Sequence, residues 1–509
     1  MMIVAVLLGV VVSFAVWAVR GRTAWWVPAF AFSFLGGYID VGFKIYCHEI
    51  GVGLSLIGAA WLIADRPRRP EGRPPLDWSV YALAAYILGH MAVSCYSAMA
   101  GRLPGTGTIV RLYVNGLWGL VFAAVFWRYG DLRHFRVALS WATVFGVIRI
   151  ALGVFSIYTP LPAADRANPW LYASSSGADL RASAPALMAL LTIWFYQRRE
   201  GIARVVLLAV YVAAIWLTLL GASRVAALSV FVIPCIWALV QRRGAALLGY
   251  SAAVAALIVA INVSPGFFRG LPDGARRALS TFVVVHYSEE RGTTAGGATA
   301  GTTIAGGTTA GTTTAGTTTA GGTTAGTTTA GTTTAGGTTA GGTTAGRDIA
   351  GRETSSSDDW HVRLLQAGWR RWTADLASFT FGNRLEGWRQ EYAKASSVEE
   401  MVDVAVRLAA YESAFFTITA TLGVIGLLLF VRVMYWLYRP FAGDILRHGI
   451  RHQDDALAFV AVQGLILYVA LCWIAGGYPS AQIVLGSLAA ASVYDRSGAL
   501  ALGGSESPG

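Results

Sequence analysis

The residues of this chain most able to do chemistry are arginines that lie within or beside long apolar segments. Arg149 lies inside one apolar run, Arg224 opens another, and Arg363 belongs to a long polar segment between two runs. A charged side chain in hydrocarbon costs at least about 2.5–3.5 kcal/mol, so such residues normally face a cavity or a partner. A guanidinium presents a rigid fork of donors that fits phosphate oxygens two at a time, which suits a diphosphate. The alternatives are snorkelling of Arg149 to headgroups, or pairing with Asp179 or Glu412.

The composition is that of a membrane protein. Hydrophobic residues make up 55% of the 509 positions, charged residues make up 13%, and the mean hydropathy is +0.54. The net charge of +11 does not indicate nucleic-acid binding, because no basic cluster alternates with aromatic residues on a soluble domain. The four cysteines lie in apolar segments without metal-ligand spacing, so we expect neither disulfides nor a metal site.

The apolar segments predict an all-α, polytopic helical membrane protein with about 11–13 transmembrane helices. The expected spans are 2–19, 24–38, 44–64, 78–97, 107–127, 135–158, 182–196, 202–220, 224–240, 244–264, 412–432, 456–475 and 480–494. The first has no basic start and no small-residue cleavage site, so we expect a retained helix rather than a signal peptide. Two spans, 24–38 and 480–494, are short for a full crossing of the bilayer.

Basic loops alternate along the chain and predict its orientation. The basic loops are 65–73, 127–136, 197–204, 241–244 and 447–452. The positive-inside rule makes their side cytoplasmic, in a bacterial inner membrane. The expected domains are therefore N-terminal transmembrane helices (1–264), a periplasmic loop (265–411), and C-terminal transmembrane helices with a short tail (412–509).

The predicted periplasmic loop contains one low-complexity insert and two helices. Residues 292–346 are almost only Thr, Ala and Gly, which cannot bury a core, so disorder is favoured over a threonine-faced solenoid. Residues 361–376 carry apolar side chains at helical spacing, namely Val362, Leu365, Trp369, Trp372 and Leu376. Ser397 and Glu400 form a capping box at the start of a second helix.

Three stretches of the chain resemble the O-antigen ligase and O-antigen polymerase superfamily, the integral-membrane glycosyltransferases of bacterial polysaccharide assembly. LLGASRVAALSVFV is similar to that family's Ser-Arg-Gly stretch at the opening of a span. The segment 361–388 resembles its periplasmic arginine, tryptophan and glycine segment, through Arg363, Trp369, Gly382 and Gly387. The segment 411–431 is similar to the family's span that follows the loop, with Gly423 and Gly426 in the matching places.

The chain departs from the ligase pattern at four positions. Glu412 stands where the ligases have a histidine, and Ser413 stands in place of an asparagine. Val225 replaces the glycine after Ser-Arg, and Arg384 interrupts the glycine pattern. The resemblance to a polysaccharide polymerase is therefore closer than the resemblance to a ligase.

The resemblance implies glycosyl transfer from an undecaprenyl-diphosphate-linked glycan donor to a sugar hydroxyl of a glycan acceptor, without a metal or another cofactor. Arg224 and Arg363, together with Arg149, would bind the diphosphate, and Glu412 would be the general base. His286 and His361 are weaker base candidates. The expected function is an O-antigen or exopolysaccharide polymerase, with a ligase as the alternative and a lipid-linked oligosaccharide flippase as the alternative from another class. Membrane lipids and other polysaccharide-assembly proteins are the expected further partners.

Overall fold

The computed structural model describes eight main stretches of the chain. They are 73–100, 106–130, 201–220, 224–271, 357–385, 397–408, 413–449 and 480–503. The other described positions are short pieces and single residues between 11 and 64, at 132, and between 275 and 283. The predicted spans 135–158, 182–196 and 456–475 and the insert 292–346 lie outside the described residues.

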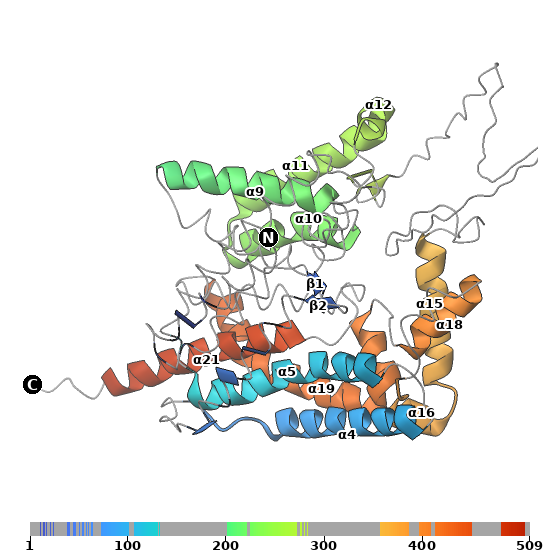
Figure 1. Ribbon diagram of the computed structural model, residues 1–509. Coiled ribbons are helices and arrows are strands. Elements are labelled where there is room, and N and C mark those ends of the chain that lie inside the picture. The colour runs from blue at the N-terminus through green and yellow to red at the C-terminus, as the bar shows by residue number, and fades with distance from the viewer. Residues whose placement is uncertain are drawn as a thin grey trace, which may run out of the picture. The chain divides into compact units, whose positions relative to one another are not determined.

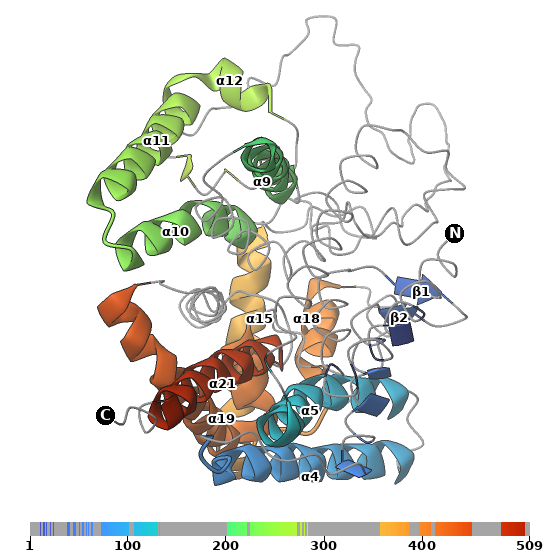
Figure 2. The ribbon, with the colours of Figure 1, turned by 90° about the vertical axis from the view of Figure 1, so that its left-hand side faces the viewer.

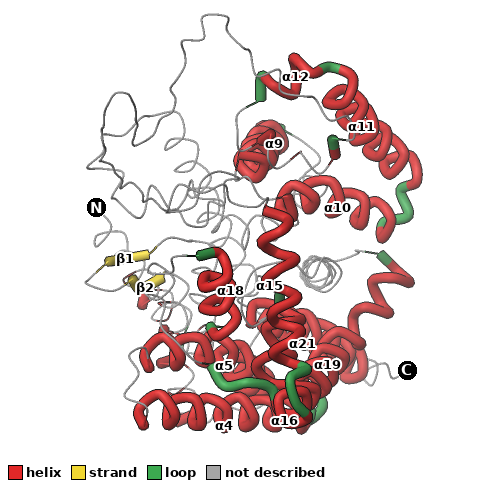
Figure 3. The backbone as a smooth tube through the Cα atoms, turned by 90° about the vertical axis from the view of Figure 1, so that its right-hand side faces the viewer, coloured by secondary structure: helices red, strands yellow, loops and turns green. Residues whose placement is uncertain are grey.

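The described residues are almost all helical, which confirms the predicted all-α class for this part of the chain (Figure 3). The helices are α4 (Trp78–Ala100), α5 (Thr106–Tyr129), α9 (Ile202–Leu220), α10 (Arg224–Val240), α11 (Gly244–Val263), α12 (Pro265–Arg269), α15 (Ser357–Trp372), α16 (Leu376–Phe381), α18 (Val398–Arg407), α19 (Ala414–His448) and α21 (Ser480–Gly503). A short antiparallel pair was not predicted: β1 (Tyr38–Asp40) begins at the last residue of the predicted span 24–38, and β2 (Lys44–Tyr46) takes up the first three residues of the predicted span 44–64, so the prediction of helix from residue 44 was wrong. Strands of three residues are too short to show a period in the sequence.

Three of the described helices are long and apolar enough to cross a membrane. They are α4, α11 and the stretch Phe415–Arg447 of α19. These helices overlap the predicted spans 78–97, 244–264 and 412–432. The prediction ended the last of them too early, because α19 continues past Arg432 as far as His448.

The chain divides into two compact units. The first contains residues 1–283, 371–386 and 409–509, and the second contains residues 284–370 and 387–408. The first unit therefore includes a short part of the predicted periplasmic loop. Within it, α5 packs against α4 and α21, and α19 packs against α4, α16 and α21 (Figures 1 and 2). A separate set of contacts joins α9 to α10, α10 to α11, and α11 to α12.

Small residues let α21 approach its neighbours closely. Ala489, Ala490 and Ala491 are fully buried, as is Leu488 beside them. Gly486 lies under the ring of Tyr438 on α19, and a Cβ there would be only 2.7 Å from the ring. Small residues at a helix interface, which let the backbones approach each other, are typical of helix packing in membranes.

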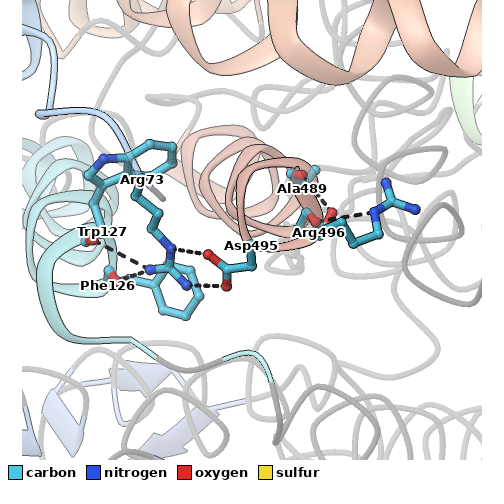
Figure 4. Close-up of polar contacts among 7 residues, drawn as sticks. Arg73, Phe126, Trp127, Ala489, Asp495 and Arg496 are labelled. Atoms are coloured by element: carbon cyan, nitrogen blue, oxygen red, sulfur yellow. Dashed lines mark hydrogen bonds and ion pairs between the residues drawn. The ribbon is translucent and has the colours of Figure 1, made fainter. Parts of the chain in front are cut away.

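The buried side chain of Arg73 joins three elements, namely the chain before α4, helix α5 and helix α21 (Figure 4). The basic loops predict that this end of the three helices is cytoplasmic. Arg73 lies before α4, and its Nε and Nη2 atoms each lie 2.6 Å from a carboxylate oxygen of Asp495 on α21. Its Nη1 donates to the carbonyl oxygen of Phe126 at 3.0 Å, and the guanidinium lies over the Phe126 ring, 5.2 Å from its centroid. The indole of Trp127 on α5 donates to the carbonyl oxygen of Pro74 at 2.7 Å.

A second ion pair fixes the start of α4 against α19. Asp77 caps α4 by accepting a hydrogen bond from the Ser79 amide at 2.9 Å, and its other oxygen lies 2.8 Å from Nη2 of Arg432. Burial alone would raise the pKa of the Asp77 carboxyl, but hydrogen bonds from Ser79 and the hydrogen bond and charge of Arg432 hold this pKa below its usual value. Asp77 is therefore ionised at neutral pH.

Replacing Arg73 with methionine should destabilise the folded protein, because Asp495 and two backbone carbonyls would lose a charged donor. Hydrogen bonds to charged groups are worth about 1.5–3 kcal/mol, so the melting temperature in detergent should fall by several degrees. Arg128→Met on α5 is the matched control, because Arg128 is exposed and should change the melting temperature little. Equal shifts for the two variants would contradict this account of the pair.

Candidate functional site

The four residues predicted to form the site are not brought together by the described part of the structure. Arg149 and Glu412 lie outside the described residues. Arg224 is the first residue of α10, and only its backbone is described. Arg363 lies on α15, where its Nη1 pairs with Glu399 of α18 at 3.0 Å. Both side chains are largely exposed, at 50% and 75%, and a pair of this kind contributes at most about 1 kcal/mol.

The helix predicted at 361–376 exists, but its bounds and its buried face differ from the prediction. It ends at Trp372, and Leu376 begins the separate helix α16. The buried positions are Leu364, Gly368 and Trp372, whereas Val362 and Trp369 are exposed. The buried face of the helix was predicted wrongly because one of its residues, Gly368, has no side chain and so does not count as apolar in the sequence pattern. The capping box of α18 is confirmed, since the Ser397 hydroxyl accepts a hydrogen bond from the Glu400 amide at 3.1 Å.

The most unusual feature of the described residues is a break in α19. At Gly423 the backbone has φ +64° and ψ −167°, a conformation that is essentially restricted to glycine. Three buried threonines precede the break, and the hydroxyls of Thr417, Thr419 and Thr421 donate back to carbonyls of their own helix. The helix starts at Ser413, whose buried hydroxyl has no hydrogen-bond partner among the described residues.

A second glycine, Gly382 at the end of α16, packs directly against this break. It has the same kind of backbone, with φ +82° and ψ −176°. A Cβ on Gly382 would lie 2.4 Å from the Thr421 carbonyl, and a Cβ on Gly423 would lie 2.3 Å from the Thr380 carbonyl oxygen. The two backbones can approach this closely only because neither residue has a side chain. Next to this contact, the Asn383 amide donates to the carbonyl oxygen of Ala420 at 2.7 Å.

Two residues of α4 hold the contact from the side. The Tyr86 hydroxyl lies 3.1 Å from the carbonyl oxygen of Phe381 and 3.1 Å from that of Leu422, so it bridges the two sides of the glycine contact. His90 stacks edge-on against Tyr86, with ring centroids 4.8 Å apart.

The chain after Gly382 then follows α4 toward its end at Ala100. The Leu385 amide donates to Oγ of Ser94 at 3.3 Å, and this hydroxyl lies 3.1 Å from the hydroxyl of Tyr113 on α5. One turn further along α4, Nη1 of Arg384 donates to Oγ of Ser97 at 3.2 Å. Arg371 is close by, since its Nη2 donates to the Arg384 carbonyl oxygen at 3.3 Å.

The site therefore combines a glycine contact, a tyrosine bridge and two arginines near the Ala100 end of α4. The sequence indicated the glycines through the family resemblance, whereas Arg384 stood out only as a departure from that family's pattern. It gave no signal for Tyr86 or Tyr113, which lie within apolar runs. Within the described residues, no group of three His, Cys, Asp or Glu side chains is placed to hold a metal ion.

None of the family models, curated proteins or solved structures compared with this chain matches it.

Gly423→Ala should destabilise the protein by at least about 2 kcal/mol, because it combines a strained backbone with a clash against Thr380. Gly382→Ala should have a similar effect through Thr421. The matched control is Gly443→Ala on the same helix, where a Cβ meets open space and should stabilise the protein by about 0.4–1 kcal/mol. Thermal unfolding in detergent measures all three, and a Gly423→Ala protein as stable as the wild type would show that the break is not as described.

Proposed function

We propose that the chain is a multi-pass protein of the bacterial inner membrane that transfers glycosyl groups from a lipid diphosphate donor to a sugar hydroxyl, as a polysaccharide polymerase. The observation that carries this proposal is the contact between Gly382 and Gly423. These glycines belong to the two stretches, 361–388 and 411–431, that resemble the loop and the following span of the polymerase and ligase superfamily. Two segments that resemble one family's functional segments pack against each other.

The contacts within the first unit support the orientation on which the proposal depends. Arg73 pairs with Asp495, and Asp77 pairs with Arg432, so the start of α4 and the later parts of α19 and α21 share one end. Arg242, from the loop before α11, donates to the Arg447 carbonyl oxygen at the final turn of α19. The positive-inside rule makes this end cytoplasmic. The opposite end, where Arg384 meets Ser97, is then periplasmic.

The proposed chemistry uses one carboxylate and a group of arginines. Glu412 directly precedes Ser413, whose buried hydroxyl has no hydrogen-bond partner among the described residues, and Glu412 would take the proton from the acceptor hydroxyl. The acceptor oxygen forms a bond to the anomeric carbon, and the bond from that carbon to the diphosphate oxygen breaks. The electron pair leaves on the diphosphate, whose growing charge Arg224, Arg363 and Arg149 would stabilise.

The ion pair between Arg363 and Glu399 allows a test of whether Arg363 binds the diphosphate. If Arg363 binds the diphosphate, Arg363→Lys should lower kcat by up to about 10²-fold without loss of folded protein, because a point charge cannot replace the bidentate fork. Glu399→Gln should leave kcat unchanged, because it removes only the competing partner. Arg370→Lys, at an exposed position on the same helix, is the control. The assay is turnover per folded molecule with a purified lipid-linked donor.

The same assay separates the candidate activities. A polymerase extends its product in steps of one repeat unit, a ligase transfers one finished glycan, and a flippase moves the donor between leaflets without transfer. Equal losses for Arg363→Lys and Glu399→Gln, with less folded protein, would show that the pair is structural. Near-normal turnover of Glu412→Gln would remove the proposed general base.

A further inference from the structure

We infer that residues 373–385 form a re-entrant segment, which enters the membrane from the outer face, turns at the break in α19, and exposes one face of α16 to the acyl chains of the bilayer. The inference goes beyond the proposed function and does not depend on glycosyl transfer. It requires only that α4 and α19 cross the membrane, for which both are long and apolar enough.

The depth of the segment follows from its contacts. Tyr86, which bonds to the Phe381 carbonyl, lies about 21 Å along the helix axis from the end of α4 at Ala100, at 1.5 Å per residue. Gly423, which contacts Gly382, lies about 14 Å from the start of α19 at Ala414 on the same measure. The hydrocarbon core is about 30 Å thick, so the turn at Gly382 lies well inside it.

Irregular backbone at this depth requires that its polar groups find partners in the protein. The segment meets this requirement largely from its own residues. Asp375 accepts a hydrogen bond from the Ser378 amide, and the Ser378 hydroxyl lies between Oδ2 of Asp375, at 3.0 Å, and Oδ1 of Asn383, at 3.1 Å, so it can donate its one hydrogen to either. Nδ2 of Asn383 donates to the Arg371 carbonyl oxygen.

Other polar groups of the segment form hydrogen bonds with the indole NH of Trp372 and with α4 and α19. The Trp372 indole donates to the Phe379 carbonyl oxygen at 3.1 Å, and its ring stacks on the Phe379 ring with centroids 5.2 Å apart. The amides of Asn383 and Leu385 donate to α19 and α4, respectively, as described above. Water can satisfy the backbone groups of a loop outside the membrane, so pairing of this kind within the protein favours a position away from water.

The side chains of α16 give independent support. This helix is apolar, yet it buries none of its six residues. Leu376 is 80% exposed, Phe379 40% and Phe381 52%. On α4, Val93 is also an exposed apolar residue, less than one turn beyond His90. Acyl chains cover such a surface without any specific partner.

The test is the accessibility of a nitroxide spin label to two relaxing agents, measured on the full-length protein in lipid vesicles. The label is attached to a single cysteine after replacement of the four native cysteines by alanine. A label at Phe379→Cys should be several-fold more accessible to oxygen, which concentrates in hydrocarbon, than to a water-soluble nickel chelate. A label at Arg370→Cys on α15, which is exposed and outside the segment, should show the opposite preference.

The tyrosine bridge provides the second arm of the test. Tyr86→Phe removes both hydrogen bonds and should shift the Phe379 label toward the nickel chelate. Tyr81→Phe, at an exposed position on the same helix, should not. A wild-type Phe379 label that prefers the nickel chelate would overturn the inference. A label reached by neither agent would also overturn it, because protein rather than lipid would then cover α16.

Discussion

A membrane helix that is interrupted must find new partners for the backbone groups that the interruption frees, and this constraint organises the described part of the chain. Next to the break at Gly423, the carbonyls of Ala420 and Leu422 accept hydrogen bonds from groups outside α19. The Asn383 amide bonds to the first, and the Tyr86 hydroxyl bonds to the second. Both partners are polar groups that reach the break from outside α19. The fold of residues 371–386, their place in the first unit and the two glycine conformations all follow from this requirement.

The same constraint connects the fold to the proposed activity. The segment that fills the break ends at Arg384, which bonds to Ser97 near the outer end of α4. The break also separates the first turns of α19, which begin at the buried Ser413 next to Glu412, from the long remainder of the helix. In the proposed function, the diphosphate of the donor would bind arginines near this internally paired structure, and Glu412 would accept the proton. Preorganised donors of this kind stabilise charge that develops during reaction.

The sequence predicted several helices and one helix cap, but it did not predict the long-range contacts that hold the helices together. Apolar runs predicted α4, α11 and the first part of α19, because hydrophobic length is a direct consequence of membrane thickness. The capping box at Ser397 was predicted because its two partners are three residues apart. The hydrogen bond between Tyr86 and Phe381 joins residues almost three hundred positions apart, and no local sequence pattern predicts it. The sequence placed Arg363 in a diphosphate site, whereas its described partner is Glu399, on a different helix.

The central claim is that residues from the predicted loop lie against α4 inside the membrane, and a disulfide between Ser94→Cys and Leu385→Cys tests it most directly. The Leu385 amide nitrogen lies 3.3 Å from Oγ of Ser94, which limits the separation of the two Cα atoms to at most about 7 Å, close to the range that a disulfide spans. With the native cysteines replaced and a protease site inserted at 292–346, oxidation should keep the two fragments joined on a non-reducing gel. A control with Leu446→Cys in place of the cysteine at 385 should release them. Fragments that separate for both pairs, although the cysteines react after denaturation, would contradict the account.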